Sequence, residues 1–478
     1  MRRRLLVLGL LGVCLGVPAQ ASARVDVGPR LAVPQQMRLV AYYPAHDGWT
    51  YMWQHWDPRQ IDHDFGLVAN LHANTVRIFV QPSVWGFPHP SRQGRQQLET
   101  VLSLAGKHGL AVELTLFDWW FDYGRVADSK TWVRSLLSGY ADDPRIAAIE
   151  LRNEIDPSNP AAIAWAKALL PYVRQVLPET PVTLSVSSND PVNRLAALSS
   201  ELAPVAPDFW SFHYYDKPEY ALWTIAAARA AVAPVPLVVG ETGYEPNLSA
   251  PQPKSPADIE AEQSRYFRTV ANAAALLGLP PPGVWVLLDF SPGASPVAMP
   301  QAEYRFGLFR TDGTPKPDAS VVRSMFLQAG TVDPSFDGGF ERPGFGPWRV
   351  HGSGATREAV IVHGGAGSVA LTPAGGRTTL TTIPSVPWVT PGQTLSVSGW
   401  VRGILTTGTT EVELRWFAAD RTPLGVTDSE ALPSGTVGWT LLTASGQAPP
   451  GAAFVAIALI SDGNSGSAVF DDVSLAAG

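Results

Sequence analysis

Two glutamates, each at the carboxyl end of a β-like run, have the residue type and the setting for chemistry. Glu154 stands in the string IELRNEID (149–156), and Glu241 stands in PLVVGETGY (236–244). Two facing carboxyl groups can cleave a glycosidic bond, because one protonates the leaving oxygen while the other, ionised, attacks or supports the anomeric carbon. One such glutamate would more often be an ordinary polar residue where a strand meets a loop, but two in Asn-Glu and Gly-Glu contexts favour catalysis.

Eight short β-branched runs alternate with helical patterns between about residues 37 and 328, and these elements must position the two glutamates. The runs are 38–43, 74–80, 110–117, 146–151, 182–187, 209–214, 236–241 and 284–290. Eight strands with intervening helices predict an α/β fold, a (β/α)8 TIM barrel, whose strand tips all open on one face. Glu154 and Glu241 would then follow strands four and seven. A doubly wound open sheet is the alternative, although it would normally use fewer strands.

Three helix starts are marked by a capping residue followed by proline. They are Asp57-Pro58, Asn159-Pro160 and Ser255-Pro256. Proline fits the first helical position because its missing N–H would have no partner inside the helix, so a helix is expected to begin at each of these prolines.

The sequence pattern changes after the barrel segment. Residues 329–336 look like a linker, and residues 337–478 contain short alternating runs separated by Gly and Pro turns. This pattern predicts an all-β sandwich of about 140 residues. Two domains also suit a chain of 478 residues, since a single core rarely grows past roughly 300.

The first 23 residues predict export. Three arginines precede an apolar stretch and small-residue cleavage sites, which is typical of a signal peptide (1–23), and the stretch is too short to span a bilayer. A secreted or extracellular protein is therefore expected. A lipid anchor on Cys14, the single cysteine, is the competing hypothesis, disfavoured by bulky Val13 before it. The formal charge of −7 becomes −10 when those three arginines leave, which gives no electrostatic case for binding nucleic acid or an anionic membrane.

The barrel segment resembles the clan A retaining glycoside hydrolases, most of all the cellulase-like, family 5 type. Asn153-Glu154 after strand four and Glu241 after strand seven carry the resemblance. It implies that Glu154 is the acid/base, that Glu241 is the nucleophile, and that Asn153 contacts the substrate 2-hydroxyl.

Supporting positions extend the resemblance. Arg77 in NTVRIFV matches a strand-two arginine that holds the nucleophile ionised, and His213-Tyr214-Tyr215 matches a His-x-Tyr after strand six, in which Tyr215 would donate to the nucleophile. Taken singly, Arg77 could be a barrel-wall ion pair, His213 a core imidazole and Tyr215 ordinary packing. Their occurrence together on the expected strands favours catalysis.

Physical arguments agree with these roles. A cation near Glu241 would keep it a carboxylate, whereas Glu154, if partly desolvated, would hold its proton. Glu150 is a competing carboxyl group on strand four. Four residues at about 3.3 Å each would place it about 13 Å deeper than Glu154, in the barrel interior or wall.

Aromatic residues are dense around the expected barrel mouth, and sugar rings stack on indoles, so we expect Trp119 and Trp85 to line the cleft. Two positions depart from the family pattern. The tryptophan usual at the end of strand eight comes early, as Trp285, which leaves the floor under the sugar unassigned. Asp118 stands where strand three often carries histidine.

The C-terminal segment resembles the jelly-roll carbohydrate-binding modules found beside such hydrolases. The resemblance implies a structural calcium ion held by Glu341 and Asp471, since oxygen ligands suit that ion. Five tryptophans could form a binding platform, with Trp348 and Trp439 favoured for the core instead. They are Trp348, Trp388, Trp400, Trp416 and Trp439. Sugar binding and a purely supporting role both remain open.

The combined expectation is a secreted, monomeric retaining β-glycosidase that cuts inside a β-1,4-linked glucan, mannan or xylan by double displacement, without a catalytic cofactor. The glucan and mannan types lead. One alternative is an exo-acting glycosidase, with the 241–258 insertion blocking one end of the cleft. Another is an inactive extracellular protein that only binds carbohydrate.

Overall fold

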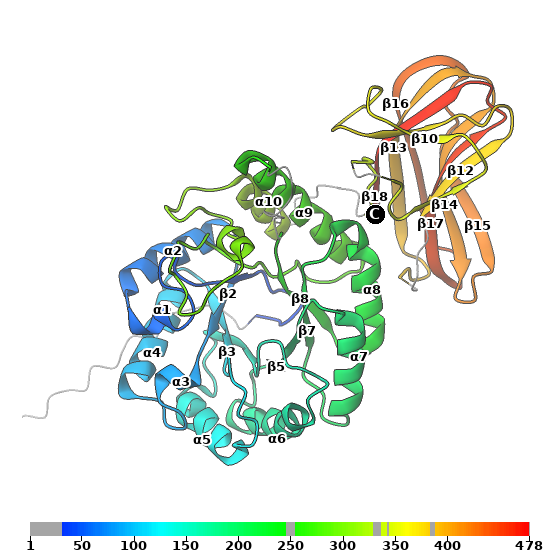
Figure 1. Cartoon of the computed structure of the whole chain (residues 1–478). Helices are drawn as coiled ribbons and strands as arrows, with labels where there is room; N and C mark the ends of the chain where they lie inside the picture. The colour runs from blue at the N-terminus through cyan, green and yellow to red at the C-terminus, as the bar shows by residue number, and fades with distance from the viewer. Residues whose placement is uncertain (1–30, 245–253, 328–335, 342–343, 383–387, 478) are drawn as a thin grey trace, which may run out of the picture.

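The computed structural model describes residues 31–244, 254–327, 336–341, 344–382 and 388–477, which form a helix-ringed barrel followed by a β sandwich (Figure 1). The expected signal peptide, Cys14, half of the 241–258 insertion (245–253) and all of the expected linker except Phe336 lie outside these residues.

The barrel strands are short and parallel, and the predicted (β/α)8 barrel is confirmed. They are β1 (Leu39–Ala41), β2 (Thr75–Phe79), β3 (Ala111–Thr115), β4 (Ile146–Glu150), β5 (Val182–Thr183), β6 (Ser185–Val186), β7 (Trp210–Tyr214) and β8 (Leu237–Thr242). Pairing runs from β1 to β5 and from β6 to β8. Since β5 and β6 are two parts of one run, β7 is the sixth barrel strand and β8 the seventh.

The eighth barrel strand is reduced to a bridge at Val284. This residue pairs in parallel with both Val40 and Thr242 and so closes the barrel between β1 and β8. The approach is close, because a Cβ atom at Gly283 would lie 2.3 Å from the carbonyl oxygen of Gly240. Beyond Val284 the expected strand 284–290 makes one further bridge, from Leu288 to Phe309. The hydrogen-bonded ladder of the eighth strand is therefore much shorter than the apolar run 284–290 that predicted it.

Helices surround the barrel (Figure 1). They are α1 (Tyr51–Gln54), α2 (Pro58–Asn70), α3 (Pro82–Trp85), α4 (Arg92–Lys107), α5 (Val126–Leu137), α6 (Pro160–Val176), α7 (Pro191–Leu202), α8 (Ala221–Val232), α9 (Pro256–Leu276) and α10 (Pro317–Phe326), with the 3-10 turns η1 (Ser138–Tyr140), η2 (Pro218–Tyr220) and η3 (Gln301–Arg305). Among the described residues, no helix is long and apolar enough to cross a bilayer.

The three predicted helix starts are confirmed. Helices α2, α6 and α9 begin at the prolines that follow Asp57, Asn159 and Ser255, and each of these side chains accepts hydrogen bonds from backbone N–H groups of the first turn. The caps satisfy donors that would otherwise lack partners, which fixes where each helix leaves its preceding loop.

The C-terminal domain is an antiparallel sandwich of two five-stranded sheets, as predicted. Its strands are β9 (Trp348–His351), β10 (Ala355–Glu358), β11 (Ser368–Leu371), β12 (Arg377–Thr382), β13 (Thr394–Thr406), β14 (Thr409–Ala418), β15 (Pro423–Asp428), β16 (Gly435–Gln447), β17 (Ala452–Asp462) and β18 (Ser467–Ala477). The sheet orders are β10-β11-β18-β13-β16 and β15-β14-β17-β12-β9. Burial alternates along β13, as expected when one sheet face packs on the other sheet.

Three contacts dock the sandwich on the barrel beside α8 and α9 (Figure 1). Trp388 meets Trp223 of α8 edge to face, with ring centroids 5.8 Å apart. Asn272 Nδ2 donates to the carbonyl oxygen of Leu475, and Gln393 Nε2 donates to that of Leu276, which ends α9. Aromatic packing and hydrogen bonds to backbone thus join the two domains.

Candidate active site

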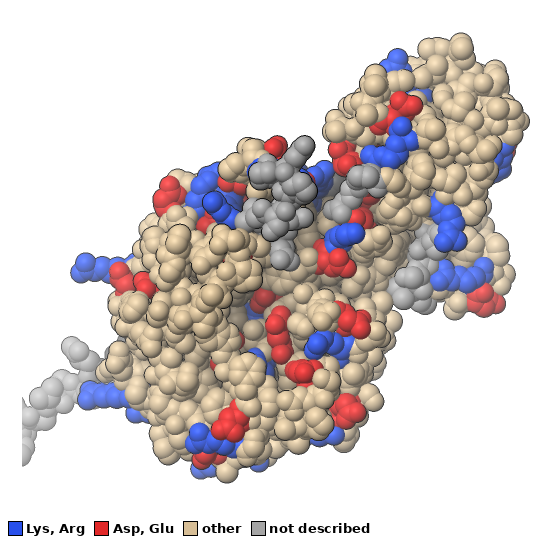
Figure 2. Space-filling model, in the orientation of Figure 1, with Lys and Arg blue, Asp and Glu red and all other residues tan. Residues whose placement is uncertain are grey.

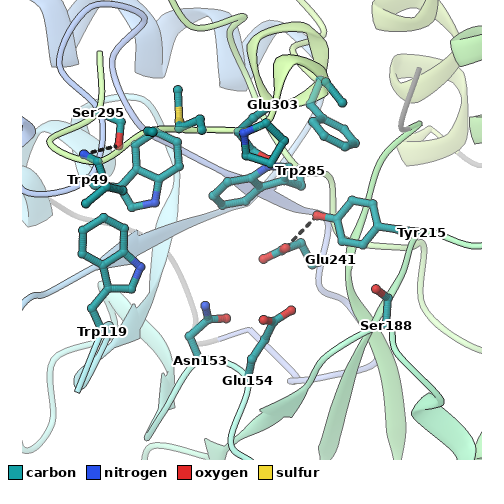
Figure 3. Close-up of a pocket in the computed structure, with 16 residues that line it drawn as sticks. Trp49, Trp119, Asn153, Glu154, Ser188, Tyr215, Glu241, Trp285, Ser295 and Glu303 are labelled. Atoms are coloured by element: carbon teal, nitrogen blue, oxygen red, sulfur yellow. Dashed lines mark hydrogen bonds between the residues drawn. The ribbon is translucent and has the colours of Figure 1, made fainter. Parts of the chain in front are cut away.

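The barrel brings the two predicted glutamates together. Glu241 is the penultimate residue of β8, and Glu154 follows the end of β4 by four residues. One carboxylate oxygen of Glu154 and one of Glu241 lie within 4.8 Å of each other (Figure 3). This separation suits direct attack by one carboxylate, whereas an inverting pair is spaced roughly 6.5–9.5 Å apart to admit a water.

A strained turn presents Glu154 to the pocket. Its φ is 50°, in the left-handed region that side chains rarely adopt. The turn is held from β6, because Glu154 N–H donates to Ser185 Oγ at 2.9 Å and Ile155 N–H donates to the carbonyl oxygen of Ser185 at 2.9 Å. Such conformations persist where neighbours fix them, and they concentrate at functional sites.

Glu241 is buried and held at both oxygens. Arg77 Nη1 donates to its Oε2, and the hydroxyl of Tyr215 donates to its Oε1 at 2.7 Å. A carboxylate that accepts from a guanidinium on one oxygen and from a phenol on the other is fixed in orientation. This is the arrangement that the sequence resemblance implied for Arg77 and Tyr215.

Arg77 is also the centre of a buried ion network in the barrel interior. Glu150 Oε2 accepts from its Nε at 3.0 Å and its Nη2 at 2.7 Å, and Asn153 Oδ1 accepts from the same Nη2 at 2.8 Å. Glu113 Oε1 lies 3.6 Å from Nε. The position of Glu150 in the interior agrees with the sequence prediction, and Arg77 proves to be a barrel ion pair and a partner of Glu241 at once.

Glu113 holds a proton near neutral pH. Burial, together with the charge of Glu150, raises its pKa to about 8. Since the unfolded value is about 4.3, the unfolded chain releases a proton that the folded chain keeps, and stability falls as pH rises from about 4.5 to about 8.

Glu113→Gln should remove this pH dependence, because a neutral amide replaces a neutral acid. We compare the melting temperature of the variant minus that of the natural chain at two pH values. This difference should be at least about 2 °C more positive at pH 8 than at pH 5. Calorimetry at both pH values, with exposed Glu201→Gln as the matched control, checks this. An equal offset at the two pH values would contradict it.

His213 lies between the carboxyl groups of Glu154 and Glu241. Its Nδ1 is 2.7 Å from Glu154 Oε1 and 3.3 Å from Glu241 Oε1. Burial lowers the pKa of His213, but the charge of Glu241 and the hydrogen bond to Glu154 raise it more, so the net shift is upward. The imidazole therefore tends to hold a proton between two anions.

The same pairing acts on Glu154 in the opposite direction. Burial raises the pKa of Glu154, but the hydrogen bond and charge of His213, followed by the charges of Arg77 and Arg152, outweigh it, so the pKa is lowered. The expectation that desolvation makes Glu154 hold its proton is wrong here, because the direct contact with His213 outweighs the effect of burial on the pKa. Among the described residues, Glu154, His213 and Glu241 also form the one group of three ligand-type side chains close enough together for an ion.

A pocket of about 400 Å³ opens at these groups, and aromatic side chains line part of it (Figure 3). Trp119 stacks on Trp49, with centroids 6.3 Å apart and 20° between the ring planes. Trp285 lines the pocket beside Glu241. The sequence left this floor unassigned because Trp285 comes early in its apolar run. The structure explains its position, because the eighth strand is a bridge at Val284 and the next residue is already at the strand tip.

Of the two tryptophans expected in the cleft, Trp119 lies in the pocket and Trp85 does not. Trp85 is 1% exposed and meets Trp53 edge to face at 4.7 Å. It also packs under α4, where a Cβ at Gly94 would lie 2.9 Å from its ring. The prediction for Trp85 is wrong because α3 ends at this residue and turns its indole toward α4 instead of the barrel mouth.

Asp118 lies beside Asn153. Asn153 Nδ2 donates to Asp118 Oδ1 at 3.4 Å, while its oxygen accepts from Arg77. Gln81 Nε2 donates to the other Asp118 oxygen at 2.9 Å. Asn153 lines the pocket with its oxygen engaged by Arg77 and one amide hydrogen directed at Asp118, which leaves its second amide hydrogen for a sugar hydroxyl.

One wall of the pocket was missed from the sequence. Half of its lining residues come from the segment after the eighth strand. They are Ser295, Val297, Ala298, Met299, Pro300, Ala302, Glu303 and Phe306. Ser188, after β6, was missed as well. The available signal was position, because loops that follow barrel strands form the functional face.

The two residues assigned to calcium lie in the sandwich. Glu341 accepts from Ala366 N–H at 3.0 Å, and Asp471 Oδ2 accepts from His363 N–H at 2.7 Å and Gly364 N–H at 3.2 Å. Both carboxylates therefore anchor the 363–366 loop. The calcium assignment stays a prediction.

Of the five sandwich tryptophans, three are buried: Trp348, Trp388 and Trp416. Trp400 and Trp439 are partly exposed, and the ring of His363 stacks on Trp400 at 4.2 Å. The core position expected for Trp348 is confirmed, and the core position expected for Trp439 is wrong.

The site sits in the hollow of the barrel face, where acidic side chains are visible (Figure 2). Together with the barrel, it defines a class, the α/β barrels that carry paired carboxylates at the carboxyl ends of the fourth and seventh strands.

Solved structures with this fold are similar to the chain. One is an exo-β-1,4-mannosidase from Opitutaceae bacterium strain TAV5, at 20% identity and a TM-score of 0.51, covering 61% of this chain and 59% of that one. Another is a GH5_18 protein from Streptomyces cattleya in complex with GlcNAc, at 18% identity and a TM-score of 0.50, covering 62% of this chain and 80% of that one. A third is a GH5_18 protein from Bifidobacterium longum subsp. infantis, at 20% identity and a TM-score of 0.50, covering 61% of this chain and 79% of that one.

At these identities the likeness establishes the fold, and the aligned part spans less than two thirds of the mannosidase. No protein-family model and no curated protein matches the chain.

Proposed function

We propose that this protein is a retaining β-glycoside hydrolase. The observation that carries the proposal is that one oxygen of Glu154 and one of Glu241 lie within 4.8 Å of each other, with Glu241 held in place by hydrogen bonds from Arg77 and Tyr215. The alternative of an inactive sugar-binding barrel is disfavoured, because binding alone needs neither the second carboxylate nor the clamp on the first.

In the first step, Glu241 Oε attacks the anomeric carbon while Glu154 gives a proton to the departing glycosidic oxygen, which leaves as an alcohol. A covalent glycosyl ester on Glu241 results. In the second step, the Glu154 carboxylate takes a proton from water, the water oxygen bonds to the anomeric carbon, and Glu241 leaves as a carboxylate with net retention.

Glu154 needs its proton before the first step, and His213 is placed to supply it. The side chain of Glu154 is 39% exposed, so a sugar that covers it removes water and favours its neutral form. The proton on His213 Nδ1 lies within a 2.7 Å hydrogen bond of the receiving oxygen. Substrate binding and protonation of the acid would then be coupled.

We propose exo action in place of the internal cleavage expected from the sequence. A continuous segment, 295–306, supplies half of the pocket lining, which suits a chain end better than a polymer passing through. The similar mannosidase is named for exo action on β-1,4-linked mannose. Sizing of products from a defined β-1,4-mannooligosaccharide series checks this, with monosaccharide release expected and early mid-chain products contradicting it.

We also propose that the chain acts outside the cell as a monomer on a β-linked oligo- or polysaccharide. The sequence of residues 1–23 supports export. Whether the sandwich, which resembles a carbohydrate-binding module, adds a second sugar site is a separate question from catalysis.

The test of the proposed function is covalent labelling. A 2,4-dinitrophenyl 2-deoxy-2-fluoroglycoside should inactivate the protein and add one fluoroglycosyl mass to the peptide that carries Glu241. The fluorine slows both formation and hydrolysis of the glycosyl ester, but the activated leaving group speeds its formation, so the ester accumulates. NMR of the first product should show the β-anomer. A label on another residue, or an α-anomer as first product, would overturn the proposal.

A further inference from the structure

The pocket is uniformly acidic in its charged groups. Glu154, Glu241 and Glu303 line it, and no Lys or Arg is among its lining residues within the described part of the chain. Glu154 and Glu241 have roles in the proposed reaction. Glu303 has none, although a carboxylate in a partly buried pocket is costly unless it is paired or used.

Glu303 is held in place by the aromatic floor. It lies in η3, and its Oε1 accepts from the indole N–H of Trp285 at 2.8 Å. The indole itself is fixed, because Trp285 packs edge to face against Phe79 at 5.9 Å and Tyr43 at 6.3 Å. The ring that a sugar would stack on and the carboxylate beside it therefore form one rigid unit (Figure 3).

The same short helix is tied to the nucleophile. Phe306, which follows η3, meets Tyr215 edge to face at 5.5 Å, and Tyr215 donates to Glu241. Burial raises the pKa of Tyr215, and the charges of Glu241 and Glu303 raise it further. Glu303 and Glu241 therefore line one pocket, and the charge of each acts on Tyr215.

We propose that Glu303 is a specificity residue that accepts hydrogen bonds from hydroxyl groups of the sugar over Trp285, and that its charge disfavours uronides. A carboxylate offers about four acceptor positions, so one oxygen can hold the indole while the group also receives hydroxyl donors. A sugar acid would bring its own carboxylate next to that of Glu303, so we expect repulsion to disfavour uronides even though Arg77 and His213 offset part of the charge of Glu241 and Glu154. This inference rests on the proposed glycosidase function and narrows it.

The test compares substrates and variants together. The natural chain should hydrolyse its best neutral 4-nitrophenyl β-glycoside with a kcat/KM at least about 100-fold above that of 4-nitrophenyl β-glucuronide. Glu303→Gln should lower kcat/KM for the neutral substrate about 10- to 100-fold, because a charged hydrogen bond is lost, and should narrow the gap to the glucuronide. Preference of the natural chain for the glucuronide would overturn the inference.

Deoxy substrates separate binding from mere support of the fold. For at least one of the 3-, 4- and 6-deoxy forms of the neutral substrate, kcat/KM should be nearly the same with Glu303→Gln as with the natural chain. That substrate already lacks the hydroxyl group that Glu303 binds, so the substitution removes nothing further. Equal losses across the whole series would show that Glu303 only supports Trp285, and would overturn the inference. Glu201→Gln, on the exposed end of α7, is the matched control and should leave all rates unchanged.

The failure of this inference is distinguishable from failure of the proposed function. If the natural chain forms no fluoroglycosyl adduct and cleaves neither neutral nor anionic β-glycosides, the glycosidase proposal fails and this inference fails with it. If it labels at Glu241 and cleaves neutral substrates, while Glu303→Gln shows no dependence on any hydroxyl, only the specificity role of Glu303 is rejected.

Discussion

Glu241→Ala is expected to lower kcat by at least about four orders of magnitude on any aryl β-glycoside that the natural chain cleaves. A positioned nucleophile acts at an effective concentration on the order of 10⁵ M or more, and alanine removes it while leaving the acid/base in place. Steady-state rates measured on the two proteins side by side give the ratio.

Chemical rescue distinguishes this loss from misfolding. Azide is small enough to occupy the space left by the carboxylate and to attack the anomeric carbon from the same side, so Glu241→Ala with a dinitrophenyl β-glycoside should release phenol and form the α-glycosyl azide. Glu201→Ala, on the surface, should retain full activity and gain nothing from azide. A β-glycosyl azide from Glu241→Ala would instead place the nucleophile elsewhere.

Glu154→Ala is the second large effect, and it should depend on the leaving group. For an alkyl glycoside or oligosaccharide, whose leaving oxygen needs a proton, kcat/KM should fall about 10²- to 10⁴-fold. For a 2,4-dinitrophenyl glycoside, which leaves without a proton, kcat/KM should change little, and a long-lived glycosyl ester should accumulate because no base activates water.

The pH profile adds an independent measure of this role. In the natural chain the alkaline limb of kcat/KM reports loss of the proton shared by Glu154 and His213, whose pKa is raised by the two carboxylates. With dinitrophenyl substrate and Glu154→Ala, that limb should disappear. A retained limb, or an equal loss on both classes of substrate, would count against Glu154 as the acid/base.

The sequence by itself determined the local features of this protein. The prolines after Asp57, Asn159 and Ser255 located three helix starts, because capping involves neighbours a few residues apart. The β-branched runs located the strands, and strand number alone placed Glu154 and Glu241 on one face, since every strand of a (β/α)8 barrel ends there.

Only the tertiary structure decided what surrounds those two glutamates. Glu113 and Glu150 meet Arg77 because neighbouring strands align them in depth, a register that periodicity does not contain. Trp85 and Trp119 both follow a barrel strand closely, six residues after β2 and four after β3, yet the indole of Trp85 packs under α4 and that of Trp119 faces the pocket.

The tertiary structure also decided the pocket wall formed by residues 295–306 and the hydrogen bond from Trp285 to Glu303. They depend on how a loop folds back over the barrel. Contacts between segments distant along the chain set that path, and the residues in the loop do not encode it locally.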